Sequence, residues 1–123
     1  MGAFPGCHDL NLLAVETSTE LCSVAVLRGD SLFVEEFLAL NRHAEILVPV
    51  VRRLLRRAGL APADCHAFAF GQGPGSFTGI RIACGLVQGL AFAANRPVVP
   101  VPSFLALAEE AGGSRVVTAF DAR

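Results

Sequence analysis

The sequence predicts an α/β fold in which a mixed β-sheet carries helices on its faces. Three short apolar runs follow one another near the N-terminus and are separated by turn residues, which is the pattern of a three-strand meander. Segments with helix and strand periodicity then alternate along the rest of the 123 residues. Sequential strands followed by alternating units are typical of a mixed sheet covered by helices, and the length suits one domain.

Each strand of the meander ends at a turn signal. The predicted strands run from Leu10 to Glu16, from Leu21 to Arg28 and from Ser31 to Leu38. The hydroxyl-rich residues 17–20 form a tight turn between the first two strands, and Gly29-Asp30 is a two-residue hairpin signal. We therefore expect the three strands to pair in the order of the sequence.

A first long helix is predicted from about Asn41 to Ala58. Its apolar side chains lie on one side and four arginines lie on the other. Pro49 either kinks this helix or marks its first turn, and Gly59 ends it. The apolar side consists of Leu47, Val50, Val51, Leu54, Leu55 and Ala58.

A second long helix, from about Thr78 to Asn95, is apolar almost all round. Its few polar side chains form one narrow stripe at helical spacing. The stripe consists of Thr78, Arg81, Gln88 and Asn95. Gly85 and Gly89 lie one turn apart beside it, where another backbone can approach closely. A helix of this kind is buried on more than one side: one side faces the sheet, and the other faces the first helix or a second polypeptide.

The remaining elements complete the alternation. Strands are predicted at residues 65–70, 98–101 and 116–120, and a short helix capped by Ser103 extends to Ala111. The order β-β-β-α-β-α-β-α-β is the outline of a ribonuclease-H-like half-domain. Residues 1–9 lack the basic start and apolar core of a secretory signal, so we expect a flexible arm there.

Composition limits the function classes. Hydrophobic residues make up 53% of the chain, which excludes disorder. No apolar run reaches the roughly 18 residues of a membrane span, so we expect no membrane partner. The net charge is −1 and all ten basic residues are arginine, which excludes lysine chemistry and a global basic field for nucleic acid. A domain of this size cannot bury all of its apolar side chains. The high hydrophobic content therefore predicts an interaction surface.

Cysteine and histidine give no metal pattern. The cysteines are Cys7, Cys22, Cys65 and Cys84. None has metal-ligand spacing, and we interpret them as buried thiols of a cytoplasmic protein. The three histidines lie far apart, and His43 has no second histidine on its helix face. We therefore expect no metal site.

Two segments carry possible ligand chemistry. Four glycines surround Pro74 between Gly71 and Gly79, at the start of the second long helix. Such a loop either offers N–H groups to a phosphate or makes a sharp turn without a ligand. The segment Glu16 to Thr19 either holds a phosphate and Mg²⁺ or is turn chemistry alone.

The arginine cluster of the first helix also allows two interpretations. It is either a solvated face or a contact for RNA phosphates. Ile46 and Pro49 interrupt this polar face, which fits a mixed surface that faces a partner.

Several stretches resemble the TsaB (YeaZ) family. They are Leu13–Thr19, Cys22–Val26, Gly71–Arg81 and Gln88–Ala91. Members are bacterial accessory proteins for threonylcarbamoyladenosine modification of tRNA. The resemblance implies the fold of the actin-like ATPases, which has two ribonuclease-H-like subdomains in tandem. Residues 10–123 correspond to the N-terminal subdomain, and the second subdomain is expected to be absent.

The resemblance implies a supporting role without catalysis. The protein would be a non-catalytic paralogue of the TsaD enzyme, which moves a threonylcarbamoyl group onto the tRNA adenosine next to the anticodon. It would bind TsaD, join a complex with the ATPase TsaE and form a homodimer through the same long helices. Contact with tRNA would be only indirect.

The resemblance also assigns residues. The partner interface is expected at His43, Glu45, Ile46, Pro49, Phe77, Arg81 and Val87, and the apolar second helix independently adds Gly85 and Gly89. A candidate vestigial phosphate loop consists of Glu16, Thr17, Ser18, Thr19, Gly73 and Gly75. The family usually has Asp where this chain has Glu16, and the longer acid would disturb a Mg²⁺ position. Because actin-like folds hold nucleotide between subdomains, no cofactor is expected in the isolated chain, while nucleotide at the TsaD interface stays open.

Two other function classes compete with this interpretation. One is an enzyme of the same superfold, such as a small-molecule kinase or a metallopeptidase-like protein, for which no catalytic carboxylate pair or metal-ligand pair is evident. The other is an RNA-binding module built on the arginine cluster, whose affinity for tRNA would fall steeply with salt.

Overall fold

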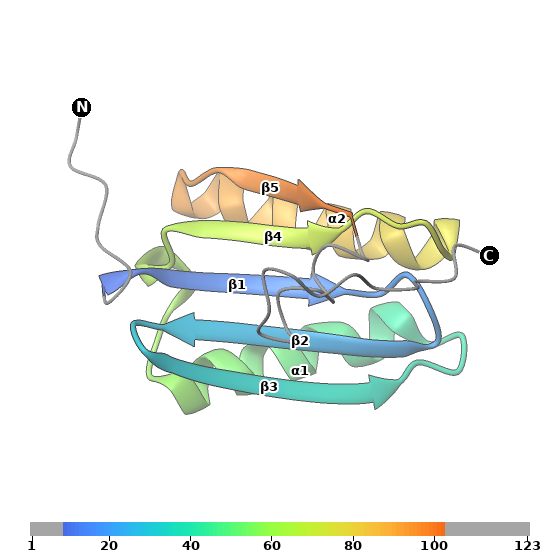
Figure 1. Ribbon diagram of the computed structural model, residues 1–123, viewed down its shortest axis with the longest axis horizontal. Helices are drawn as coiled ribbons and strands as arrows, with labels where there is room; N and C mark the ends of the chain where they lie inside the picture. Colours follow the sequence, from blue (N-terminus) through green and yellow to red (C-terminus); the bar gives the residue numbers. More distant parts are fainter. Residues whose placement is uncertain (1–8, 103–123) are drawn as a thin grey trace, which may run out of the picture.

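The computed structural model describes residues 9–102 of the chain (Figure 1). The elements are β1 (Asn11–Glu16), β2 (Leu21–Arg28), β3 (Ser31–Leu38), α1 (His43–Ala58), a short 3₁₀ helix η2 (Pro62–Asp64), β4 (Ala67–Gly71), α2 (Phe77–Ala94) and β5 (Val98–Val101). Every element predicted within this range is present, with ends that agree to within two residues; η2 was not predicted. The predicted arm at residues 1–9 (apart from Asp9), helix at 103–111 and strand at 116–120 lie outside the described residues.

The five strands form one mixed sheet in the order β3-β2-β1-β4-β5. The meander pairs antiparallel, with Leu13 opposite Val26. β4 joins β1 in parallel, with Phe68 beside Leu13, and β5 continues the parallel half. The predicted mixed sheet with a three-strand meander is confirmed.

The core lies between the sheet and both helices, which cover the same face of the sheet (Figure 1). Because side chains alternate along a strand, every second strand residue points toward the helices. The fully buried strand side chains include Leu13, Cys22, Val24, Val26 and Phe68. Three apolar side chains of β3, namely Leu32, Val34 and Leu38, are exposed instead. The prediction of helices on the sheet is thus met on one face by the two described helices.

Helix α1 begins six residues before Pro49, so the prediction that Pro49 marks the first turn is wrong. Pro49 is exposed within the helix, and the apolar side predicted from the sequence is buried. Gly59 ends the helix in the left-handed conformation, at φ 74°, where glycine has no Cβ penalty. The Arg28 guanidinium donates to the Ala58 carbonyl oxygen at 2.7 Å and satisfies a terminal acceptor.

Helix α2 packs on the sheet along a single narrow side. Only four of its 18 residues are buried, namely Gly79, Ala83, Val87 and Ala91. By length and composition alone α2 is apolar enough to cross a membrane, contrary to the expectation that no segment reaches that size. Its buried side packs on β4 and β1, which makes it a covering helix of an α/β layer. The sequence predicts that α2 is buried on more than one side. Within the described residues only the side that faces the sheet is buried.

Candidate functional site

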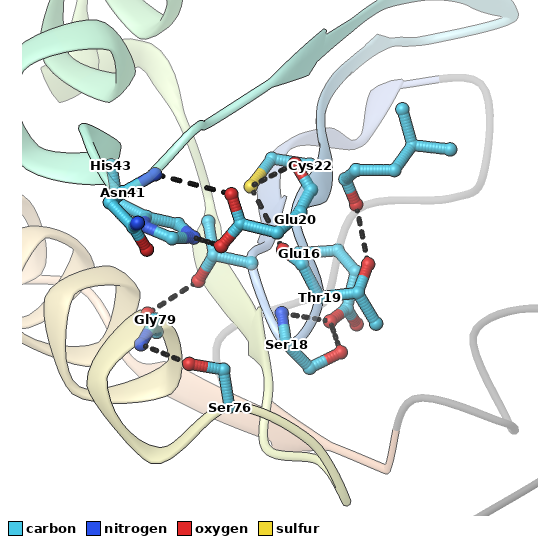
Figure 2. Close-up of polar contacts among 11 residues, drawn as sticks. Glu16, Ser18, Thr19, Glu20, Cys22, Asn41, His43, Ser76 and Gly79 are labelled. Carbon is cyan, nitrogen blue, oxygen red and sulfur yellow. Dashed lines mark hydrogen bonds and ion pairs between the residues drawn. The ribbon is translucent and has the colours of Figure 1, made fainter. Parts of the chain in front are cut away.

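The two segments with possible phosphate chemistry meet at one end of the sheet (Figure 2). The turn after β1 lies against the glycine loop that leads into α2. The Thr17 hydroxyl donates to the Gly79 carbonyl oxygen at 2.6 Å, and the Ser76 N–H donates to the Ser18 carbonyl oxygen at 2.6 Å. The sequence could not show this meeting, because the segments are about 60 residues apart.

Close packing accounts for the glycines of this loop. A Cβ on Gly75 would collide with the Ser18 backbone, and a Cβ on Gly79 would collide with the Thr17 carbonyl oxygen. Gly73 has φ 102°, a conformation that side-chain-bearing residues rarely adopt. The glycines therefore let two backbone segments touch each other.

Several donors of these two segments already have partners within the protein. One Glu16 carboxylate oxygen accepts from the Ser18 N–H at 2.9 Å and from the Ser18 hydroxyl. The Gly79 N–H donates to the Ser76 hydroxyl oxygen at 3.1 Å, which caps α2. The Thr19 hydroxyl donates to the Leu21 carbonyl oxygen at 2.9 Å. This arrangement favours the interpretation of both segments as turns without a ligand.

His43, Cys22 and Cys65 are likewise internal. His43 is only 5% exposed, and its Nε2 lies 3.9 Å from a Glu20 carboxylate oxygen without a hydrogen bond (Figure 2). Burial raises the pKa of both the Cys22 and the Cys65 thiol to about 11, with a smaller contribution from nearby carboxylates. Both are therefore protonated at neutral pH and poor nucleophiles. Between residues 9 and 102, no three side chains of His, Cys, Asp or Glu gather as a metal site would require.

A further surface feature lies between α1 and α2. An apolar hollow of about 390 Å³ separates the two helices. It is lined by Val48, Val51, Arg52, Leu55 and Arg56 of α1, by Leu60 and Pro62, and by Leu86 and Leu90 of α2. We call this hollow the α1–α2 groove.

The outer side of α2 continues this surface. Phe77 is 72% exposed and Phe92 is 89% exposed, near the two ends of the helix. Between them, Gly85 and Gly89 are exposed, and a Cβ on either would meet nothing within 4 Å. The Arg81 guanidinium lies over the Phe77 ring, 5.4 Å from its centroid. Exposed aromatic side chains beside open glycines are unusual on a solvated helix.

Comparison with known proteins identifies the family. The family model described as TsaD, tRNA N6-adenosine threonylcarbamoyltransferase, matches residues 37–123. The chain belongs to the TsaD family.

Within this family the chain is similar to TsaB (YeaZ) proteins, as the sequence motifs predict. The tRNA threonylcarbamoyladenosine biosynthesis protein TsaB of Haemophilus influenzae is 45% identical over 121 residues, which cover 94% of this chain and 51% of the relative. The Escherichia coli TsaB is 38% identical, with 93% and 51% covered. The structure of YeaZ from Pseudomonas aeruginosa matches with a TM-score of 0.79 and 49% identity, over 93% of this chain and 55% of that one.

These matches bear on the fold and on the extent of the chain. The YeaZ match confirms the ribonuclease-H-like, actin-like fold class. The chain spans about half the length of the curated TsaB relatives that it matches.

The structure exposes most of the interface residues expected from the TsaB (YeaZ) resemblance. The exposed ones are Glu45, Pro49, Phe77, Arg81, Gly85 and Gly89. Ile46 is half-buried. Val87 is fully buried, on the side of α2 that packs on the sheet, and His43 is buried at the start of α1. Val87 therefore offers a partner no exposed surface and His43 offers little, and the expected interface stays a prediction.

Sequence reasoning missed several residues of the same surface. Val48, Leu86, Leu90 and Phe92 were not among the expected contacts, although they share the groove or the outer side of α2. The apolar character of the second long helix was visible in the sequence. Which apolar residues pack on the sheet and which stay open depends on how the helix is rotated, and the structure supplies that rotation.

Proposed function

We propose that this chain is a non-catalytic binding subunit that supports a TsaD enzyme in the threonylcarbamoyl transfer to the tRNA adenosine next to the anticodon. The observation that carries the proposal is the mismatch between the composition and the burial of α2. The helix is apolar enough for a membrane span, yet only four of its 18 residues are buried. An exposed apolar face of this kind calls for a protein partner.

The lack of a visible catalytic arrangement in the described part of the chain supports a binding role. Two N–H groups beside the glycine loop, those of Ser18 and Gly79, donate to Glu16 and Ser76. The buried thiols are protonated, and no metal-binding cluster occurs between residues 9 and 102. Relatives named TsaB are described as biosynthesis proteins for tRNA threonylcarbamoyladenosine, and the family model that matches this chain is that of the TsaD transferase.

The same surface serves for self-association in this proposal. Two copies that meet through α1 and α2 cover the exposed Phe77 and Phe92 of each, and TsaD competes for that face. TsaE joins the complex, tRNA contact is indirect, and the assembly is cytoplasmic.

The test is the affinity of the chain for the TsaD protein from the same source, measured by isothermal titration calorimetry. Gly85→Leu and Gly89→Leu place bulk where the structure is open, so the variants fold while their outer face no longer fits a partner. Arg57→Leu is the matched control, since Arg57 is exposed on α1 and does not line the α1–α2 groove. Binding by the wild type and the control, with loss in both glycine variants, supports the proposal; absence of binding by a folded wild type overturns it for this chain.

A further inference from the structure

We infer that the α1–α2 groove receives an amphipathic helix of the partner whose carboxylates, one turn apart, pair with Arg52 and Arg56. The inference rests on the proposed function and adds the chemistry of the partner's contacting segment. It is carried by the shape and lining of the groove and by the pairing of the arginines on α1.

The floor of the groove is apolar and lies between two helices. Val48, Leu55, Leu86 and Leu90 contribute side chains from α1 and α2, and the two helices make few direct contacts with each other. A helix laid over such a seam can insert its apolar side chains between both neighbours, as helix-in-groove complexes do. The occupant must therefore have an apolar stripe along one side.

The rim of the groove on α1 is basic. Arg52 and Arg56 line the groove and also a second hollow of about 280 Å³, which Arg53 shares together with Val48 and Pro49. Residues four apart on a helix are neighbours on one face, about 6 Å apart along the axis. A partner helix with acidic residues at the same spacing can match both guanidinium groups.

The other two arginines of this cluster do not line the groove. The Arg53 guanidinium pairs with the Glu35 carboxylate of β3 at 2.7 Å, and the charge of Arg57 also lowers the pKa of the Glu35 carboxyl. For Arg52 and Arg56, residues 9–102 supply no ion-pair partner. The cluster is thus divided by position: Arg53 is paired with the sheet, Arg57 lies outside the lining of the groove, and Arg52 and Arg56 line it.

This division favours an acidic helix over RNA. Phosphate backbones are bound by extended basic surfaces with stacking aromatics, whereas here two unpaired arginines border an apolar hollow. The chain has no Tyr or Trp. An apolar floor with a two-charge rim is instead the composition of a protein interface with a polar edge.

The experiment compares two charge-reversed chains in binding to the TsaD protein from the same source. In Arg52→Glu/Arg56→Glu the groove rim becomes acidic, and we expect the affinity to fall roughly tenfold or more because like charges then face each other. Arg57→Glu has one reversed charge outside the groove and is expected to bind like the wild type. Arg52→Gln/Arg56→Gln, which adds no repulsion, is expected to weaken binding less. Reversing an acidic pair on one TsaD helix to arginine should restore binding to the doubly reversed chain alone.

The outcomes separate this inference from the proposed function. If the wild type does not bind TsaD, both fall. If it binds and the doubly reversed chain binds equally well, the proposed function stands and the inference is overturned. If binding to TsaD is unchanged while binding to labelled tRNA is lost in the doubly reversed chain, with a steep salt dependence in the wild type, the arginines serve RNA and the inference is overturned.

Discussion

The hydroxyl of Thr17 donates to the Gly79 carbonyl oxygen at 2.6 Å, and the carbonyl oxygen of Thr17 lies where a Cβ of Gly79 would be. This hydrogen bond and this close contact hold the first turn of α2 against the turn after β1. They orient α2 on the sheet so that Val87 is buried and Gly85 and Gly89 are exposed.

Three glycines of the same helix should therefore respond differently to alanine. Gly79→Ala is expected to lower the free energy of unfolding by about 2–3 kcal/mol, because the new methyl group meets backbone that cannot move away easily. Gly85→Ala and Gly89→Ala are expected to raise it by about 0.5–1 kcal/mol each, because alanine is the better helix former and the space is open. Urea denaturation followed by circular dichroism measures all three. Equal effects at the three positions would contradict the packing described for α2.

Glu16 is predicted to stabilise the turn after β1. Its carboxylate holds both the N–H and the hydroxyl of Ser18, so Glu16→Ala should cost about 1–2 kcal/mol of folding free energy. Glu16→Gln keeps an acceptor oxygen and should cost less. Urea denaturation of both variants checks the order, and a Glu16→Ala chain as stable as the wild type would show that the carboxylate holds nothing.

The sequence predicted most of the described fold but less of the candidate site. Strand periodicity and the Gly29-Asp30 hairpin depend on neighbours in the sequence, and the strands from Leu21 to Arg28 and from Ser31 to Leu38 have the predicted ends. The spacing of the apolar residues in the sequence likewise predicted which side of α1 is buried. Local patterns determine these features, so no tertiary information was needed.

The site depended on contacts between distant segments. The sequence left the glycine loop open between a phosphate site and a turn, because the answer lies in the Ser18 and Thr17 backbone that fills the space beside it. Val87 was expected at the interface from the resemblance, and the almost uniformly apolar helix gave no sign that this residue faces the sheet. The pairing of Arg53 with Glu35 and the position of Arg52 and Arg56 along the groove also require the three-dimensional structure.

The isolated chain is predicted not to bind ATP with Mg²⁺. The N–H groups of Ser18, Ser76 and Gly79 already donate to Glu16, Ser18 and Ser76, and a triphosphate that used them would have to displace these internal bonds. Titration of the isolated chain with ATP and Mg²⁺ in a calorimeter should show no saturable heat. The complex of the chain with TsaD is titrated in parallel for comparison. Tight binding by the chain alone would favour the kinase-like alternative.

Cys22 and Cys65 are predicted to resist alkylation in the folded protein. Burial raises both thiol pKa values to about 11, so at neutral pH almost no thiolate is present and the reagent has no access. Cys84 is only half-buried on α2 and should react faster. Iodoacetamide treatment followed by peptide mapping distinguishes the three sites, and unfolding in urea should make them alike. Rapid labelling of Cys22 in the native state would contradict the burial of β2.

The Glu35–Arg53 ion pair should make stability depend on pH in the acidic range. The hydrogen bond from Arg53 lowers the pKa of the Glu35 carboxyl below its usual value of 4.5. The unfolded chain therefore takes up this proton at a higher pH than the folded chain does. The stabilising contribution is fully present above 4.5 and is lost as the pH falls through the lower folded value. In Arg53→Gln the Glu35 carboxyl should titrate closer to 4.5, and the stability difference from the wild type should shrink as the solution is acidified.

Carboxyl NMR titration of both proteins measures the shift in the pKa of Glu35. Arg57→Gln is the control, since the charge of Arg57 is a smaller cause of the lowered pKa. An unchanged Glu35 titration in Arg53→Gln would mean that the pair does not form in solution, and Arg53 would then be as free to face the groove as Arg52 and Arg56.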